Sequence, residues 1–158
     1  MKGTAMTGAE TKAELIQHIR TVSADLLAAI EGLSQAQMRE ESLDGWSVKD
    51  HVAHCAVWHD IRASEINRIS AGYETAWPGM ATDENNAFNE TTVRQRRGLS
   101  LQQVLWEYES SRQRVIDAIQ SATSRGLDES LYGESPPRTG HDSQHAGWIR
   151  RWRGERGY

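Results

Sequence analysis

Three histidines in this chain have the spacing expected of a metal site. His141 and His145 are four residues apart, so on a helix they lie one turn apart on the same face. His54 lies in a second segment with helical character. Imidazole is the commonest metal ligand in proteins and suits zinc and nickel. Three imidazoles on facing helices predict a divalent-metal site with an open position for water or substrate, as in catalytic zinc sites.

The His141–His145 pair would be weak support by itself, because two histidines four apart on a surface helix are most often solvated. Two features favour the metal site. The helix of the pair begins in a polar stretch, and the helix of His54 carries a polar row that includes Trp58. We expect Trp58 and Asn85 to border the pocket around the metal.

Neighbours of His54 are candidates for supporting roles. Asp50 lies one turn before it and could orient the imidazole by accepting its second N–H. Asp50 is also the natural capping-box partner of Ser47, and the two roles do not exclude each other. His51 could be a fourth ligand, but an exposed position or a supporting role behind the ligands is favoured for it, whereas His59 is predicted to have no chemical role.

The run from His141 to His145 resembles the His-Glu-x-x-His pattern of zinc peptidases, with an aspartate where those enzymes have glutamate. A base at Asp142 would be one methylene short. A helix-capping role explains Asp142 equally well, so peptidase activity is not favoured.

Composition limits the class of protein. A chain of 158 residues with 37% hydrophobic and 25% charged residues predicts one globular domain. The formal net charge of −4 argues against general nucleic-acid binding, and the arginines of 150–156 would suit a helix C-terminus. The single cysteine, Cys55, is predicted to be a buried thiol and fits a reducing cytosol. Neither a signal peptide nor a membrane span is expected, so the prediction is cytoplasmic.

Apolar periodicity and capping residues predict helices and no strand. The fold class is therefore all-α, a four-helix bundle with a short helix or lid at 83–97 between the second and third long helices. Residues 1–10 are predicted to be loosely held, 11–153 to form the single domain and 154–158 to form a tail. The four long helices are expected at 11–33, 47–70, 100–119 and 139–153.

The segment from Gly45 to His54, followed by Trp58, resembles the second-helix signature of the DinB-like (DinB/YfiT-type) metal-binding four-helix bundles. The segment from Asp83 to Glu90, leading through 94–100 into the third long helix, is similar to the corresponding part of that superfamily. So is the late His-x-x-x-His pair. The similarity covers nearly the whole chain after residue 11.

This resemblance implies a divalent metal, usually zinc or nickel, held by His54, His141 and His145. Similar proteins include enzymes that transfer low-molecular-weight thiols such as bacillithiol or mycothiol, and enzymes that isomerise maleylpyruvate with mycothiol. Others resemble hydrolases, including colibactin self-resistance proteins. The resemblance also implies a homodimer.

We therefore predict a metal-dependent enzyme, a thiol-dependent transferase or a hydrolase, acting on a small electrophilic molecule. The alternative is a non-enzymatic metal-binding, stress-response or self-resistance scaffold. Nucleic-acid binding through the arginine tail ranks last, so the expected partners are a small-molecule substrate and a second copy of the chain, without nucleic acid or membrane.

Overall fold

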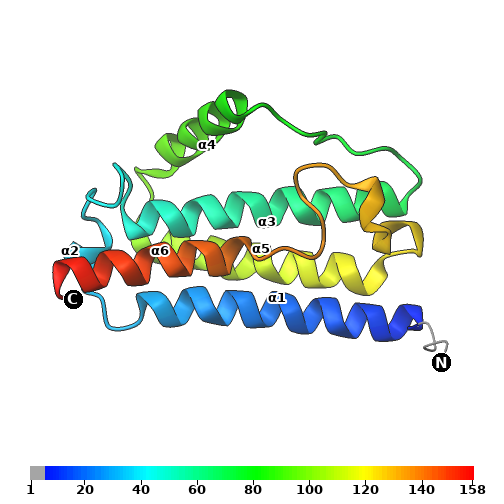
Figure 1. Cartoon of the computed structure of the whole chain (residues 1–158), viewed down its shortest axis with the longest axis horizontal. Helices are drawn as coiled ribbons and strands as arrows, with labels where there is room; N and C mark the ends of the chain where they lie inside the picture. Colours follow the sequence, from blue (N-terminus) through cyan, green and yellow to red (C-terminus); the bar gives the residue numbers. More distant parts are fainter. Residues whose placement is uncertain (1–5) are drawn as a thin grey trace.

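The computed structural model of the protein describes residues 6–158. Over these residues the chain is helical and has no β-strand, which confirms the all-α prediction. Four long helices form the bundle, and a short helix and a crossing helix lie between them (Figure 1). In chain order the helices are α1 (Gly8–Ile30), α2 (Gln35–Met38), α3 (Val48–Ser70), α4 (Thr82–Arg96), α5 (Leu101–Ser121) and α6 (His141–Arg156), with 3-10 turns at Arg125–Leu127 and Glu129–Leu131.

The start of α1 lies one turn earlier than predicted. Thr7 and Glu10 form a complete capping box, and this box is used in place of the predicted one at Thr11. Residues 8–10, expected to be loosely held, are therefore the first helical turn. Thr7 is held as the cap of that turn, and the part of the prediction that concerns residues 1–5 lies outside the described residues.

Other boundaries also differ from the predictions. Ser34 caps the short helix α2 within a stretch predicted to be a plain connection. Ala81, which offers no side-chain acceptor, precedes α4 in place of the predicted cap Asp83. At the far end α6 continues to Arg156, so most of the predicted tail at 154–158 is helical.

The long helices pack as two pairs, and α4 lies outside them. Contacts are densest between α3 and α5 and between α1 and α6, and α4 lies beside α3 at the edge of the bundle (Figure 1). Apolar side chains fill two clusters, one around Val52 and Tyr108 and the other around Ile66 and Ile119. The stretch between these clusters, where α3 faces α6, holds polar side chains.

None of the helices in the described part of the chain has the length and apolar character needed to cross a lipid bilayer.

Candidate metal centre

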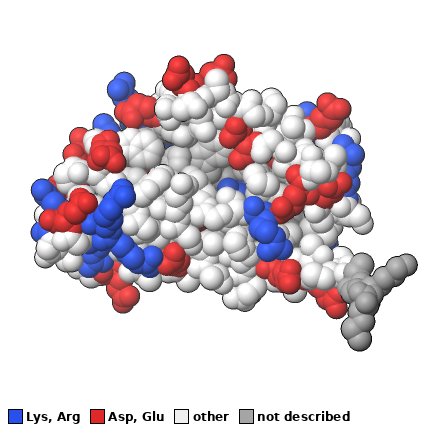
Figure 2. All heavy atoms as spheres, viewed as in Figure 1, with Lys and Arg blue, Asp and Glu red and all other residues white. Residues whose placement is uncertain are grey.

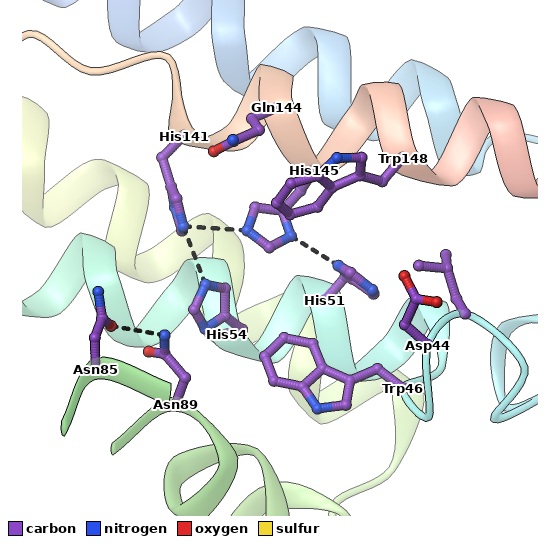
Figure 3. Close-up of a pocket in the computed structure, with 11 residues that line it drawn as sticks. Asp44, Trp46, His51, His54, Asn85, Asn89, His141, Gln144, His145 and Trp148 are labelled. Atoms are coloured by element: carbon purple, nitrogen blue, oxygen red, sulfur yellow. Dashed lines mark hydrogen bonds between the residues drawn. The ribbon is translucent and has the colours of Figure 1, made fainter. Parts of the chain in front are cut away.

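The three predicted ligands meet in one place. His54 projects from α3, and His141 and His145 project from the first turns of α6 toward it (Figure 3). The Nε2 atom of His141 lies 3.0 Å from Nε2 of His54 and 3.1 Å from Nε2 of His145. The ligand atoms of all three lie within 4.8 Å of one another.

The donor chemistry of this cluster fits a divalent cation. Burial lowers the pKa of His54 to about 3 and that of His141 to about 4, and lowers the pKa of His145 further. Each ring is therefore neutral near pH 7 and can offer a lone pair. One proton cannot serve both nitrogen contacts of His141, whereas one cation can accept all three lone pairs. Nitrogens bound tetrahedrally to one zinc ion at about 2.0–2.1 Å are about 3.3–3.4 Å apart, slightly more than the 3.0 and 3.1 Å between the rings here.

His51 supports this cluster from behind. Its Nδ1 lies 2.7 Å from Nδ1 of His145, which leaves Nε2 of His145 directed to the other two ligands. Burial lowers the pKa of His51 to about 4, so both rings are neutral and share one hydrogen bond. Of the two roles predicted for His51, the supporting one matches this geometry.

Asp50 does not make the predicted contact with His54. Its carboxylate accepts a hydrogen bond from the Ser47 backbone N–H at 3.0 Å and lies 3.3 Å from an Arg97 guanidinium nitrogen. Nδ1 of His54 is buried and has no hydrogen-bond partner among the described residues. The orienting role is thus corrected to the capping role, because a carboxylate held at the helix start cannot also reach a ring one turn along.

Asp142 is not the helix cap that the sequence suggested. The cap position of α6 is Gly140, and the Asp142 side chain points into the bundle, where it is 2% exposed. Its Oδ2 accepts hydrogen bonds from His59 Nε2 at 2.8 Å and from the Tyr108 hydroxyl at 2.6 Å. Burial opposes ionisation, but the interactions with His59 and Tyr108 outweigh it and hold the pKa of Asp142 well below its usual value.

His59, predicted to have no chemical role, is therefore part of a buried network next to the metal cluster. Its Nδ1 lies 3.1 Å from the Ser111 hydroxyl, and the Tyr108 oxygen, whose proton goes to Asp142, lies 3.1 Å from the Ser23 hydroxyl and can accept from it. The network ties α1, α3 and α5 to the first turn of α6, which carries His141. One sequence signal pointed to it, because Tyr108 lies in an apolar stripe and a buried tyrosine hydroxyl needs a partner.

The histidine cluster lines an open cavity of about 440 Å³. Viewed as in Figure 1, the surface is hollowed between α4 and α6 (Figure 2). Trp46 and Trp148 stand beside the histidines, and Asn85 and Asn89 reach in from α4 (Figure 3). Asn85 thus borders the cavity as predicted.

Trp58 borders a smaller neighbouring cavity of about 130 Å³. Its indole N–H donates to Asn89 Oδ1 at 2.9 Å, and Asn89 in turn donates to Asn85 at 2.8 Å. His141 and the two asparagines line both cavities, so the two spaces share a wall.

Cys55 lies near His141 and Asp142, and the three could offer ligand atoms to one ion. Its side chain is fully buried, as predicted. Burial and the Asp142 carboxylate raise the pKa of the thiol well above its usual value. Since only the thiolate is a metal ligand, we assign Cys55 to the core.

Comparison with known proteins agrees with the all-helical fold. A profile of the DinB superfamily matches residues 18–149, which include all three predicted ligands. The chain belongs to the DinB superfamily. Curated proteins gave no match to it.

Two solved structures share the fold of this DinB-superfamily protein. An uncharacterised protein from Escherichia coli UTI89 is 17% identical, with a TM-score of 0.74 over 92% of this chain and 94% of that chain. The colibactin self-resistance protein ClbS, in complex with double-stranded DNA, is 18% identical, with a TM-score of 0.70 over 89% of this chain and 93% of that one.

The ClbS complex corrects the prediction that nucleic acid is excluded as a partner. That prediction relied on the net charge of −4. A protein with the same fold is solved with DNA bound, so the fold itself is compatible with a nucleic-acid partner. The predicted homodimer had only the family resemblance behind it and stays a prediction.

Proposed function

We propose that this DinB-superfamily protein is a metal-dependent enzyme that joins a low-molecular-weight thiol to a small electrophilic molecule, or hydrolyses that molecule. The metal is zinc or nickel, held by His54, His141 and His145. The observation that carries the proposal is the convergence of three neutral imidazoles, 3.0 and 3.1 Å apart, at the wall of an open cavity. A purely structural site would be closed off by a fourth protein ligand.

A divalent metal in such a site lowers the pKa of a bound water or thiol toward neutrality. The chain supplies the surroundings for this chemistry. His51 fixes the ring of His145, and the Asp142 network fixes the helix that carries His141. Trp46 and Trp148 give the cavity apolar walls, and the Asn85 and Asn89 amides offer hydrogen bonds opposite the histidines. Aromatic walls combined with a few convergent hydrogen-bonding groups suit the binding of a small molecule.

The thiol, where one is used, must come from outside the chain. Cys55 is the only cysteine, and its buried thiol is held protonated. A free cysteine also suits the reducing cytosol, where small thiols are abundant.

Metal analysis of the purified protein tests the site. We expect about one zinc or nickel ion per chain in the wild type and a loss of at least tenfold in affinity in His145→Ala, because a ligand is lost. His18→Ala is the matched control, since His18 contacts the Thr139 carbonyl and lines neither cavity. Equal metal content in wild type and His145→Ala would refute the site.

Reaction with a chromogenic electrophile, with and without added thiol, separates the two reaction classes. Product that forms only with thiol supports transfer, and product that forms equally without thiol supports hydrolysis. A metal-loaded protein that is inactive in both assays, with several thiols and electrophiles, would favour the scaffold alternative.

Binding of double-stranded DNA is a second candidate, favoured by the ClbS complex. The arginines of α6 are its natural contacts, but three of them are already engaged: Arg150 with Asp25, Arg153 with carbonyls at the end of α1, and Arg156 with Glu40. Fluorescence anisotropy with a labelled duplex at two salt concentrations tests it. Phosphate-based binding weakens steeply with salt, and the absence of binding at low salt would exclude this candidate.

A further inference from the structure

The smaller cavity beside the metal centre contains a buried arginine. Arg62 lies on α3 two turns after His54, and its side chain is 3% exposed. Its Nε–H donates to the Pro136 carbonyl at 3.1 Å, which fixes the plane of the guanidinium. The residue lines the cavity together with His141, Asn85 and Thr139.

No ion pair within the described residues involves Arg62. Two carboxylates lie in its surroundings, but both are engaged elsewhere. Asp142 accepts from His59 and Tyr108, and Glu134 accepts from the Met80 backbone N–H at 2.5 Å. Burial disfavours the charged form and lowers the pKa of Arg62, with Asp142 opposing that shift. A guanidinium stays charged in proteins, so this cavity contains a cation that lacks a direct counterion.

Further hydrogen-bond donors face the same space. The Asn85 side-chain oxygen accepts from Asn89, and no hydrogen bond of the described residues uses the Asn85 amide N–H groups. Asn85 projects from α4 on the side of His141 (Figure 3). Because His141 and Asn85 also line the larger cavity, a bound molecule can span both spaces.

We propose that Arg62 binds a carboxylate of the molecule that reacts at the histidine cluster. The guanidinium offers its two terminal nitrogens to the two carboxylate oxygens, and Asn85 donates from α4. The carboxylate thus anchors the substrate in the smaller cavity while its electrophilic atom lies in the larger one. The identity of the anchored molecule as the substrate rests on the proposed function, whereas the binding of a carboxylate does not.

A carboxylate suits this cavity better than a phosphate. Glu134 also lines it, so Arg62 and Glu134 together bring no net charge. A monoanion can sit against Arg62, but a second negative charge would face Glu134 without compensation. Planar guanidinium and planar carboxylate also match each other in a two-pronged pair.

Two-dimensional NMR of the full chain tests the anchor, with metal removed by the uncharged chelator phenanthroline so that the probe cannot bind metal. The probes are acetate, its neutral analogue acetamide, and inorganic phosphate. We expect acetate to shift the Arg62 Nε–H and Trp58 indole signals saturably, at least tenfold more tightly than acetamide or phosphate. Arg62→Met should abolish this binding, and Arg112→Met, which removes a guanidinium that hydrogen-bonds Ser23 outside both cavities, should retain it.

Equal binding of acetate and acetamide by the wild type would overturn the proposal, and so would tighter binding of phosphate. These comparisons use only the wild-type protein, so they test the proposal even if Arg62→Met does not fold. Loss of metal binding in the cluster would leave this result unchanged, which keeps the two proposals separable. Where activity is found, Arg62→Met should lower kcat/KM about 10- to 100-fold for a carboxylate-bearing electrophile and leave its methyl ester unaffected.

Discussion

The two halves of α3 bury different kinds of side chain. Every residue of the first half, from Val48 to His59, is buried. In the second half exposed residues recur at helical spacing, at Asp60, Ser64 and 67–68. The first half therefore packs on all its faces, whereas the second half buries one face only.

This difference shows how a small bundle accommodates a polar site. The second half has an apolar stripe against the core at Ala63, Ile66 and Ile69, beside the buried side chains of Arg62 and Glu65. The first half has such a stripe as well, at Val48, Val52 and Cys55. Its opposite face buries histidines, and buried polar groups cost free energy unless they are hydrogen-bonded. We therefore expect the polar half to depend on its partners and the apolar half on its volume.

The largest effect is expected from Asp142→Ala. The substitution removes the acceptor shared by His59 and Tyr108 in the polar half. Two buried hydrogen-bond donors then lack a partner, at about 1–3 kcal/mol each, so we expect a loss of about 4 kcal/mol in the free energy of unfolding. Urea denaturation measures it. A loss below about 1 kcal/mol would show that the polar half does not depend on this network.

Ile66→Ala tests the apolar half. Ile66 is fully buried in the cluster that contains Ile119. Loss of its methyl and methylene groups should cost about 3 kcal/mol through lost burial and the cavity left behind. Metal content per folded chain should stay at the wild-type value, because the site lies in the other half. A joint loss of stability and metal would contradict the separation of the two halves.

Acid should destabilise the metal-free protein through the polar half. Burial lowers the folded-state pKa of His51 to about 4 from the ordinary value of 6.5, so the unfolded chain binds more protons between these values. The contribution of His51 to the free energy of unfolding is complete above about pH 6.5 and is lost as the pH falls toward 4. The total loss is on the order of 3 kcal/mol. Unfolding free energies at several pH values measure the slope. His51→Leu should reduce it by the share of this one group, because the lowered pKa values of His54, His141 and His145 contribute to the slope as well. A wild-type profile that is level from pH 7 to pH 5 would contradict this.

The smallest effect is expected from Asp60→Ala. Asp60 pairs with Arg114 at 2.7 Å on the surface, where the two side chains are 51% and 50% exposed. Exposed ion pairs contribute about 0–1 kcal/mol. The same denaturation assay should therefore place Asp60→Ala close to the wild type, which makes it the carboxylate control for Asp142→Ala. An effect as large as that of Asp142→Ala would mean that burial is not what separates the two halves.

The helices could be predicted because their signals are local. Ser47 and Ser100 accept hydrogen bonds from backbone N–H groups three residues on, and both predicted starts are confirmed. The start of α1 was predicted one turn too late because two capping-box patterns, at Thr7 and at Thr11, follow each other. Only the packed structure selects between them. A four-residue helix such as α2 has too few residues for a periodic pattern.

The metal cluster could be predicted from the sequence because two of its histidines share one helical face. The partners of Asp142 were not, since His59 and Tyr108 come from two other helices and only tertiary packing brings them together. A local role, the helix cap, explained Asp142 sufficiently and was wrong. For Asp50 the opposite happened: the predicted long-range role was wrong and the local one was right. Its hydrogen bond to the Ser47 backbone keeps the carboxylate at the helix start, away from the His54 ring.

The helix α4 lies outside the bundle and buries few of its residues, Thr92 and Val93 among them. Yet it supplies Asn85 and Asn89 to both cavities. The ligands and the network behind them belong to the bundle, whereas these two asparagines belong to a helix that the core hardly needs. Substitutions along α4 can therefore accumulate at little cost to folding, and through them the same bundle can acquire new substrates over evolutionary time.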